Sequence, residues 1–420
     1  MEKVVIVAGA RTAIGSFGGT LRNVPAYKLA STVFNEIVKR ARIEPAWIDD
    51  VIMGQSYQNG EAANGARMAV LEAGWPDSVP GVTFDRRCCS GLDAIFFGAM
   101  KIQTGNADIV VAGGMECMSQ CELYIPGDIR WGLGGQRDEK WGFMPRGHGA
   151  LSMWGIPLYD RIQRARVMSQ PIDRYGELNS MMSWAENAAK HENISREEAD
   201  AWALRSHQRA IAAIDEGKLA EEIVPVPVPT KSAPPLLFDK DETPRRDTTL
   251  EKLSRLAPVY PEGVCTAGNS STENDGAAAL VLMSESKAKH LRLEPLAYFD
   301  ACAVAGSDPT LTYPAVPASA NKALAKAKLS MKQIDLIEIQ EAFAVQVLAD
   351  AKLMGIEPDD CDRKINVNGS GISLGHPIAA TGAMRLVTLL HEMKRQDARF
   401  GMETICGGGG LGICAILRRD

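Results

Sequence analysis

The sequence contains two copies of one pattern, and this duplication constrains the fold more than any other feature. The first copy runs from a helical stretch at residues 29–44 into the apolar run VIMG, and the second from ANKALAKAKLS into LIEIQ. In both copies a glycine-rich turn then opens an apolar helix, RRCCSG in the first and GSGISLGHP in the second. Each copy ends in a strand of small residues, ADIVVAGGMECMS or METICGGGGLGICAIL. Two similar α/β halves are the simplest account.

A less regular region separates the two copies, from about residue 120 to residue 261. It contains WGLGGQRDEKWG and continues with a helical stretch in which Ser195 and Glu198 form a capping-box pattern. The segment after this stretch, IVPVPVPTKSAPP, cannot be helical because of its prolines. We interpret the region as an insertion from the first half that covers one face of the core. A chain of 420 residues is long enough for such an addition.

Charge and cysteine content exclude several classes of protein. The net charge of −6 argues against a nucleic-acid binder, although a local basic patch would still hold a small anionic ligand. No apolar run reaches the length of about 18 residues that a membrane span needs, and the first residues do not resemble a secretory signal. The 9 cysteines show no zinc-binding spacing, so we expect a cytoplasmic protein with reduced thiols and no metal.

Cys88 is the first candidate for chemistry. It directly precedes an apolar helix that Gly105 ends, and the positive end of a helix favours thiolate over thiol. The alternative is a packed core thiol. The position at a helix mouth rich in glycine and serine favours a nucleophile.

His376 is the second candidate. Pro377 fits the first turn of a helix, which places His376 at a helix N-terminus, where an imidazole is biased towards its neutral form. Such a group accepts a proton from a thiol. The other histidines lack this setting and are expected to be structural: His148, His191, His207, His290 and His391.

Cys406 opens CGGGGLG, a run that lets backbone N–H groups approach a ligand closely. The run suits an oxyanion hole or a phosphate cradle, although it lacks the Lys-Ser/Thr of a P-loop. Two cysteines and one histidine on three glycine-rich turns suit acyl transfer through a covalent thioester. One thiol would hold the acyl group and the other would move a proton.

At these residues the chain resembles the thiolase family, which makes or cleaves 3-oxoacyl-coenzyme A thioesters. CCSG matches the family's Cys-x-Ser-Gly motif and makes Cys88, rather than Cys89, the acylated residue. The resemblance covers essentially the whole chain, through RTAIGSFGGTL, GGMECMS, LRSHQRA, TAGNSSTENDGAAALVLMS, NVNGSGISLGHP and CGGGGLG.

The resemblance implies a five-layered α-β-α-β-α core of two βαβαβαββ halves with an inserted loop domain, assembled as a homodimer or homotetramer. It places the N-terminal half at residues 1–119 and 248–286, a coenzyme A-binding loop domain at 120–247, and the C-terminal half at 287–420.

The resemblance also implies roles for the three reactive residues. Cys88 takes up the acyl group as acetyl-CoA is released, and in the synthetic direction Cys406 removes an α-proton from acetyl-CoA. His376 activates Cys88 and stabilises the thioester enolate. The backbone N–H groups of Cys88 and Gly408 form an oxyanion hole for the tetrahedral intermediate.

Coenzyme A and acyl-CoA are the expected partners, as substrates rather than as a tightly bound cofactor. The family places the nucleotide end near Arg245 and the pantetheine arm near Ser271, with Ala267 and Phe343 beside it. Arg245 would supply the local positive charge that an acidic protein needs to hold phosphates.

The sequence departs from the family pattern at three places. Gln340 replaces the asparagine that orders a water in another oxyanion hole, and it would displace that water or donate directly. Residues 180–183 read Ser-Met-Met-Ser where short-chain biosynthetic enzymes carry His-Met-Gly. The segment 120–179 is long, and its aromatic residues either shape a larger acyl site or pack the extra loop: Trp131, Trp141, Trp154 and Tyr159.

We therefore expect thiolytic cleavage of a 3-oxoacyl-CoA longer or bulkier than acetoacetyl-CoA. Synthesis of acetoacetyl-CoA is the first alternative. A decarboxylating ketoacyl synthase is another, but those enzymes use Cys-His-His or Cys-His-Asn, and Cys406 argues against them. The third alternative is a thiolase-like subunit that needs a partner.

Overall fold

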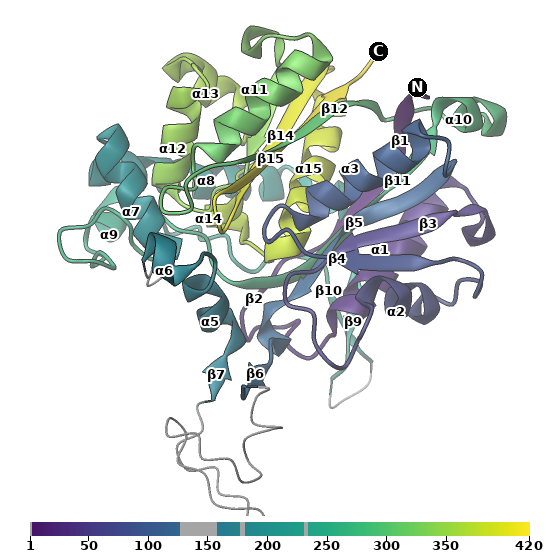
Figure 1. Cartoon of the computed structure of the whole chain (residues 1–420), viewed down its shortest axis with the longest axis horizontal. Coiled ribbons are helices and arrows are strands. Elements are labelled where there is room, and N and C mark those ends of the chain that lie inside the picture. The colour runs from purple at the N-terminus through teal and green to yellow at the C-terminus, as the bar shows by residue number, and fades with distance from the viewer. Residues whose placement is uncertain (1, 127–157, 177–180, 231–233) are drawn as a thin grey trace, which may run out of the picture.

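The computed structural model describes residues 2–126, 158–176, 181–230 and 234–420. Two groups of strands form the centre of the molecule (Figure 1). The first group consists of β1 (Val4–Thr12), β3 (Asp50–Gly54), β4 (Gly81–Phe84), β5 (Ile109–Cys117) and β11 (Asn274–Ser284). The second group consists of β12 (Ala297–Gly306), β13 (Leu336–Ile339), β14 (Phe400–Gly407) and β15 (Leu411–Arg418).

The two groups repeat one pairing order. In the first, β3 is parallel to β5, β5 is antiparallel to β11, and β11 is antiparallel to β1. In the second, β13 is parallel to β14, β14 is antiparallel to β15, and β15 is antiparallel to β12. A short pairing of β1 with β12 joins the groups into one sheet. This topology confirms the duplication that the sequence predicts.

Helices cover both groups of strands and fill the space between them. The helices of the two halves are α1 (Ala26–Ala41), α2 (Gly65–Glu72), α3 (Ser90–Gln103), α10 (Glu285–Leu291), α11 (Ala315–Ala327), α12 (Ala344–Leu353), α13 (Pro358–Lys364), α14 (Gly371–Leu374) and α15 (Thr381–Arg395). Helix α3 packs on β5 and β11, α15 packs on β14 and β11, and the two helices touch each other. With α1 outside the first group and α11 outside the second, the layers run α-β-α-β-α, as expected.

Two glycines let the central helices α3 and α15 approach closely. A Cβ on Gly91 would lie 2.5 Å from the carbonyl oxygen of Ala379, and a Cβ on Gly382 would lie 2.9 Å from Cβ of Leu92. Real side chains do not tolerate such distances, so only glycine fits at these positions. The close approach sets the first turn of α3 beside the start of α15.

Local signals fix where several helices begin and end. Helix α3 stops before Gly105, whose φ is +72°, as the sequence predicts. The expected helix at residues 29–44 instead spans Ala26–Ala41, because Arg42 adopts a left-handed conformation (φ 53°) and its N–H bonds to Lys39. The capping box of Ser195 and Glu198 is confirmed.

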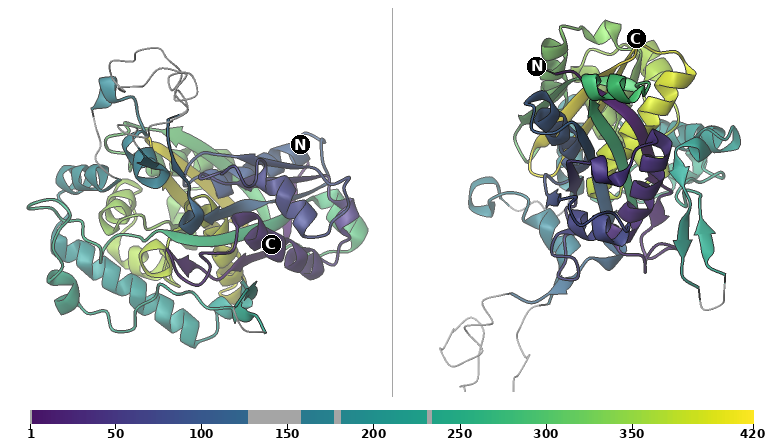
Figure 2. Two further views of the ribbon diagram at one scale, coloured as in Figure 1. Left: turned by 90° about the horizontal axis from the view of Figure 1, so that it is seen from below. Right: turned by 90° about the vertical axis from the view of Figure 1, so that its right-hand side faces the viewer.

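The inserted region is made of short strands and helices: β6 (Leu123–Tyr124), β7 (Tyr159–Asp160), α5 (Arg161–Val167), α6 (Ile172–Tyr175), α7 (Met181–Glu192), α8 (Arg196–Asp215), β8 (Ile223–Val224), β9 (Val226–Val228), β10 (Leu236–Phe238) and α9 (Leu250–Ser254). Helices α7 and α8 pack against α12 of the second half, and they lie together along one side of the molecule in Figure 2. None of the helices in the described part of the chain is long and apolar enough to cross a membrane.

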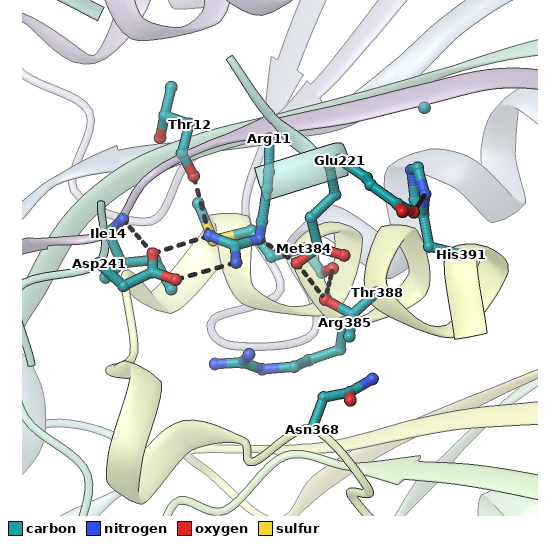
Figure 3. Close-up of polar contacts among 12 residues, drawn as sticks. Arg11, Thr12, Ile14, Glu221, Asp241, Asn368, Met384, Arg385, Thr388 and His391 are labelled. Atoms are coloured by element: carbon teal, nitrogen blue, oxygen red, sulfur yellow. Dashed lines mark hydrogen bonds and ion pairs between the residues drawn. The ribbon is translucent and has the colours of Figure 1, made fainter. Parts of the chain in front are cut away.

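A buried arginine ties strand β1 to the inserted region. Arg11 is fully buried, and its guanidinium donates to Glu222 at 2.7 Å and to Asp241 at 2.8 and 3.0 Å. Thr388 of α15 also donates to Glu222, at 2.9 Å. Figure 3 shows Arg11 between Asp241 and the residues of α15. The cluster therefore connects a strand of the first half, a helix of the second and the insertion.

We predict that Asp241→Ala lowers the free energy of unfolding by about 3 kcal/mol, because it leaves the buried Arg11 charge partly uncompensated. Urea unfolding followed by tryptophan fluorescence measures the change. Glu251→Ala is the control, since it removes a carboxylate from an exposed pair with Arg255, and it should leave the transition where it is. An Asp241→Ala protein as stable as the wild type would contradict the role given to this cluster.

Candidate active site

Cys88 lies in the turn that joins strand β4 to helix α3. The Asp85 carboxylate accepts a hydrogen bond from the backbone N–H of Arg87 at 2.6 Å, and the Ser90 hydroxyl accepts one from the N–H of Arg86 at 2.7 Å. Arg87 itself adopts a left-handed conformation, with φ 52°. These bonds hold a tight turn whose next residue, the half-buried Cys88, faces a cavity.

His376 meets Cys88 from the other half of the molecule. Its Nε2 lies 3.3 Å from Cys88 Sγ, and its Nδ1 lies 2.7 Å from the Thr381 hydroxyl oxygen. The backbone N–H of His376 donates to the Asn274 side chain at 2.9 Å. The ring is thus held at both nitrogens, with Nε2 directed at the sulfur.

The expected helical position of Pro377 is wrong. Helix α15 begins at Thr381, and Pro377 precedes the 3₁₀ turn η5 (Ile378–Ala380). Gly375, with φ 96°, places His376 between α14 and this turn. The histidine therefore lies ahead of the helix rather than on its first residue.

Cys406 and Gly408 reach the same cavity from the end of strand β14. Cys406 is 2 % exposed, and both residues line the cavity that contains Cys88 and His376. The backbone N–H groups of Gly408 and of Cys88 lie near the Cys88 sulfur, and both act to lower its pKa. The turn that follows needs glycine, because Gly410 has φ 76° and a close neighbour in Ser307. An oxygen bound to a carbon on Cys88 would therefore find two backbone donors nearby.

The structure corrects the expected charge of Cys88. Burial raises the pKa of the Cys88 thiol to about 11. Arg87 and the Gly408 N–H act to lower this pKa, but their effect is smaller than that of burial. Burial, with a contribution from Arg385, lowers the pKa of His376 to about 3. The start of helix α3 does not outweigh desolvation, so a neutral thiol faces a neutral imidazole at pH 7.

The second thiol is also neutral. Burial raises the pKa of Cys406 well above its usual value, and the nearby Cys88 adds to the effect. A protonated thiol in an apolar wall is equipped to give a proton to a carbanion and to take it back.

The cavity has a volume of about 160 Å³ and an extension towards the surface. We call the extension the groove; it is lined by Ser16, Phe17, Arg166, Met182, Glu242, Thr243, Arg245, Ala267, Ser270, Ser271, Thr272 and Glu273. Five residues line both spaces, so the groove adjoins the cavity: Arg166, Met182, Ser271, Thr272 and Glu273. A long, narrow ligand can therefore run from the surface to Cys88.

The four residues expected to contact coenzyme A lie along this path. Ser271 and Phe343 line the cavity, and Arg245 and Ala267 line the groove. His207, expected to be structural, is beside them: its Nδ1 accepts a hydrogen bond from the Arg245 N–H at 3.2 Å. Burial, and then Arg245, lower the pKa of His207 to about 4.

Gln340 is not brought to the cavity. Its side chain is fully buried, and its Oε1 lies 3.5 Å from Arg385 Nε. A Cβ on Gly371 would collide with its amide nitrogen, so the side chain lies over that glycine. Gln340 thus stands apart from the three reactive side chains, and its expected place in an oxyanion hole stays a prediction.

The long segment before α7 is covered only in part. Trp131, Trp141, Trp154, His148 and Ser180 lie outside the described residues. Tyr159 lies in strand β7, where it contacts Tyr124, and it is absent from the lining of the cavity. Met181 and Met182, which replace part of the expected His-Met-Gly motif, do line the cavity.

Sequence reasoning missed six polar residues of the cavity wall: Tyr57, Arg87, Arg166, Ser169, Thr272 and Glu273. Arg87 carried a signal, because it is a charged residue directly before the candidate nucleophile. Arg166 and Tyr57 come from distant segments and carry no motif, so nothing in the sequence marked them.

Comparison with known proteins identifies relatives along the entire chain. The family models for the thiolase N-terminal domain and the thiolase C-terminal domain match residues 4–286 and 293–419. An acetyl-CoA acetyltransferase of Pseudomonas aeruginosa is 42% identical over 100% of both chains, and a probable acetyl-CoA acyltransferase of Staphylococcus aureus is 40% identical over 100% of both.

Two solved structures are similar throughout. The crystal structure of the Bacillus anthracis acetyl-CoA acetyltransferase gives a TM-score of 0.88 at 40% identity, and covers 100% of this chain and 99% of that one. Human mitochondrial 3-ketoacyl-CoA thiolase gives a TM-score of 0.88 at 33% identity, with the same coverage of 100% and 99%.

We predict that iodoacetamide alkylates Cys88 slowly at pH 7 and about tenfold faster with each further pH unit up to pH 9.5, because only the thiolate reacts and its pKa is raised. Mass spectrometry of the Cys88 peptide measures the rate, and Cys88→Ser identifies the modified sulfur. A rate that is already level between pH 7 and pH 8 would show a thiolate–imidazolium pair instead.

Proposed function

The chain belongs to the thiolase family of acyltransferases, and on that premise we propose that it cleaves a 3-oxoacyl-CoA with coenzyme A, giving acetyl-CoA and a shortened acyl-CoA. The observation that carries the proposal is the 3.3 Å contact between His376 Nε2 and Cys88 Sγ, in a cavity that Cys406 also lines. The relatives and solved structures named above are acetyltransferases, acyltransferases or thiolases.

The first half-reaction forms an acyl-enzyme. His376 Nε2 takes the Cys88 proton, and the sulfur forms a bond to the 3-oxo carbon of the substrate. The backbone N–H groups near the sulfur, from Cys88 and Gly408, stabilise the oxyanion. The bond between carbons 2 and 3 then breaks, and its electron pair passes to carbon 2. Cys406 gives that carbon a proton, so acetyl-CoA leaves and the acyl group stays on Cys88.

The second half-reaction returns both protons. The thiol of coenzyme A gives its proton to the Cys406 thiolate, and its sulfur attacks the acyl thioester. Cys88 leaves as a thiolate and regains its proton from His376. The groove supports this route, because it offers a path for the pantetheine arm and places Arg245 at its outer part.

The reverse reaction, condensation of two acetyl-CoA molecules, is the second candidate. The similarity to the acetyl-CoA acetyltransferases of Pseudomonas aeruginosa and Bacillus anthracis favours it. The methionines at 181 and 182, where biosynthetic relatives are expected to carry His-Met-Gly, favour cleavage.

We predict that Cys406→Ala lowers thiolytic turnover by about 10²- to 10⁴-fold, the usual contribution of one general acid–base group, yet still permits slow acylation of Cys88 from an acyl-CoA. Intact-protein mass spectrometry detects the acyl group, which Cys88→Ala should never acquire. Cys361→Ala, a half-buried thiol of α13 outside the cavity, is the control for removing a sulfur. Equal loss of both half-reactions in Cys406→Ala would contradict the separate roles of the two thiols.

We predict that 3-oxoacyl-CoA substrates of six or more carbons give a higher thiolytic kcat/KM than acetoacetyl-CoA. The measurement follows loss of absorbance of the magnesium-bound 3-oxo thioester across a series of chain lengths. If acetoacetyl-CoA is the best substrate of the series, the enzyme is a short-chain one and condensation becomes the favoured function.

A further inference from the structure

Arg87 is a cation in the wall of the cavity, one residue before the reactive Cys88. Its side chain is 25 % exposed. Among the described residues its guanidinium has two polar side-chain neighbours, Asp85 at 4.0 Å and the Tyr57 hydroxyl at 3.5 Å. Both distances are at or beyond the outer limit of a hydrogen bond. An arginine fork with five donors thus retains most of its donor capacity.

One oxygen of Asp85 is used in other hydrogen bonds, and Oδ2 is the oxygen that lies 4.0 Å from Arg87. The Oδ1 of Asp85 accepts hydrogen bonds from the Ser56 hydroxyl at 2.7 Å and from the backbone N–H of Arg87 at 2.6 Å. The contrast with Arg11 is clear, because that guanidinium has close bonds to two carboxylates. Asp85 shapes the turn and does not fill the Arg87 fork.

The cavity also carries a net positive charge. Its charged lining residues are Arg87, Arg166 and Glu273, and Arg166 forms an ion pair with Glu273. Among the described residues, the nearest counter-charge to Arg87 is the Asp85 carboxylate at 4.0 Å, which does not line the cavity. A partly buried charge of this kind calls for an anion from the ligand.

The phosphates of coenzyme A are not that anion. Arg245 and the other outer residues line the groove, whereas Arg87, Tyr57 and Met118 line the cavity and not the groove. Arg87 therefore lies on the side of Cys88 that the acyl group occupies. Tyr57, Met118 and Ile378 provide an apolar wall there for methylene groups.

We propose that Arg87 binds a carboxylate at the end of the acyl chain, so that the preferred substrates are 3-oxoacyl-CoA thioesters that end in a carboxylate. The inference rests on the proposed function and names its substrate class. In the acyl-enzyme, the thioester is on Cys88 and the terminal carboxylate meets the guanidinium of the preceding residue. Arg87 then determines specificity and takes no part in proton transfer.

The test compares two six-carbon substrates, 3-oxoadipyl-CoA, which ends in a carboxylate, and 3-oxohexanoyl-CoA, which ends in a methyl group. The readout is the ratio of their thiolytic kcat/KM values. The wild-type protein should favour the carboxylate by at least about 10-fold, the effect expected of one hydrogen-bonded ion pair. Arg87→Met should lower the ratio by about 10- to 100-fold, and Arg87→Lys by less, because lysine is a single point charge.

Arg164→Met is the matched control. Arg164 stacks on Tyr159 at 4.9 Å much as Arg87 stacks on Tyr57 at 5.3 Å, but it does not line the cavity. Its replacement should leave the ratio unchanged. The wild-type ratio tests the inference by itself if Arg87→Met does not fold.

Four outcomes would overturn the inference. If the wild-type protein prefers 3-oxohexanoyl-CoA, substrates that end in a carboxylate are not its preferred class. An equal loss for both substrates in Arg87→Met shows that Arg87 acts on Cys88 and not on the acyl chain. If the folded wild-type protein cleaves neither substrate, the proposed function fails as well. If it cleaves both substrates equally well, only the inference about the carboxylate fails.

Discussion

The close contact of the two central helices is the constraint on which the site depends. Gly91 and Gly382 allow α3 and α15 to approach to distances that a Cβ would forbid. Cys88 precedes one helix and His376 precedes the other, so this contact sets the distance between sulfur and imidazole. A duplicated fold thereby supplies two equivalent turns, each with a different reactive side chain, at one place between the halves.

Burial, more than any helix end, determines the state of the reactive groups. The same apolar surroundings disfavour the thiolate of Cys88 and the imidazolium of His376, and so hold both groups neutral. These two groups therefore need not lose a charge before the thioester enters. Charge appears only when the sulfur attacks, next to backbone N–H groups that are already in place.

Much of the fold and part of the site could be predicted from the sequence, for reasons specific to each element. Strands and helices recur in the same order in both halves, so a pattern match was enough to predict two similar α/β halves. The parallel pairs β3–β5 and β13–β14 occupy equivalent places in them. The meeting of Cys88, His376 and Cys406 was predicted from three glycine-rich turns, each with one reactive side chain. The pKa of Cys88 did not follow, because desolvation comes from residues far away in the chain. The same is true of Gln340, whose side chain is directed by Gly371 and Arg385.

The position of β11 in the sheet has a consequence for biosynthesis. This strand lies between β1 and β5, although the chain reaches it only after the whole insertion. Arg11 likewise cannot bond to Asp241 until that residue, 230 positions later, has been synthesised. A nascent chain therefore carries two unpaired apolar strand edges until Ser284 leaves the ribosome, a delay on the order of 10 s at ordinary rates of translation. Such edges are templates for wrong pairing, and the first half cannot complete its sheet until the insertion has been synthesised.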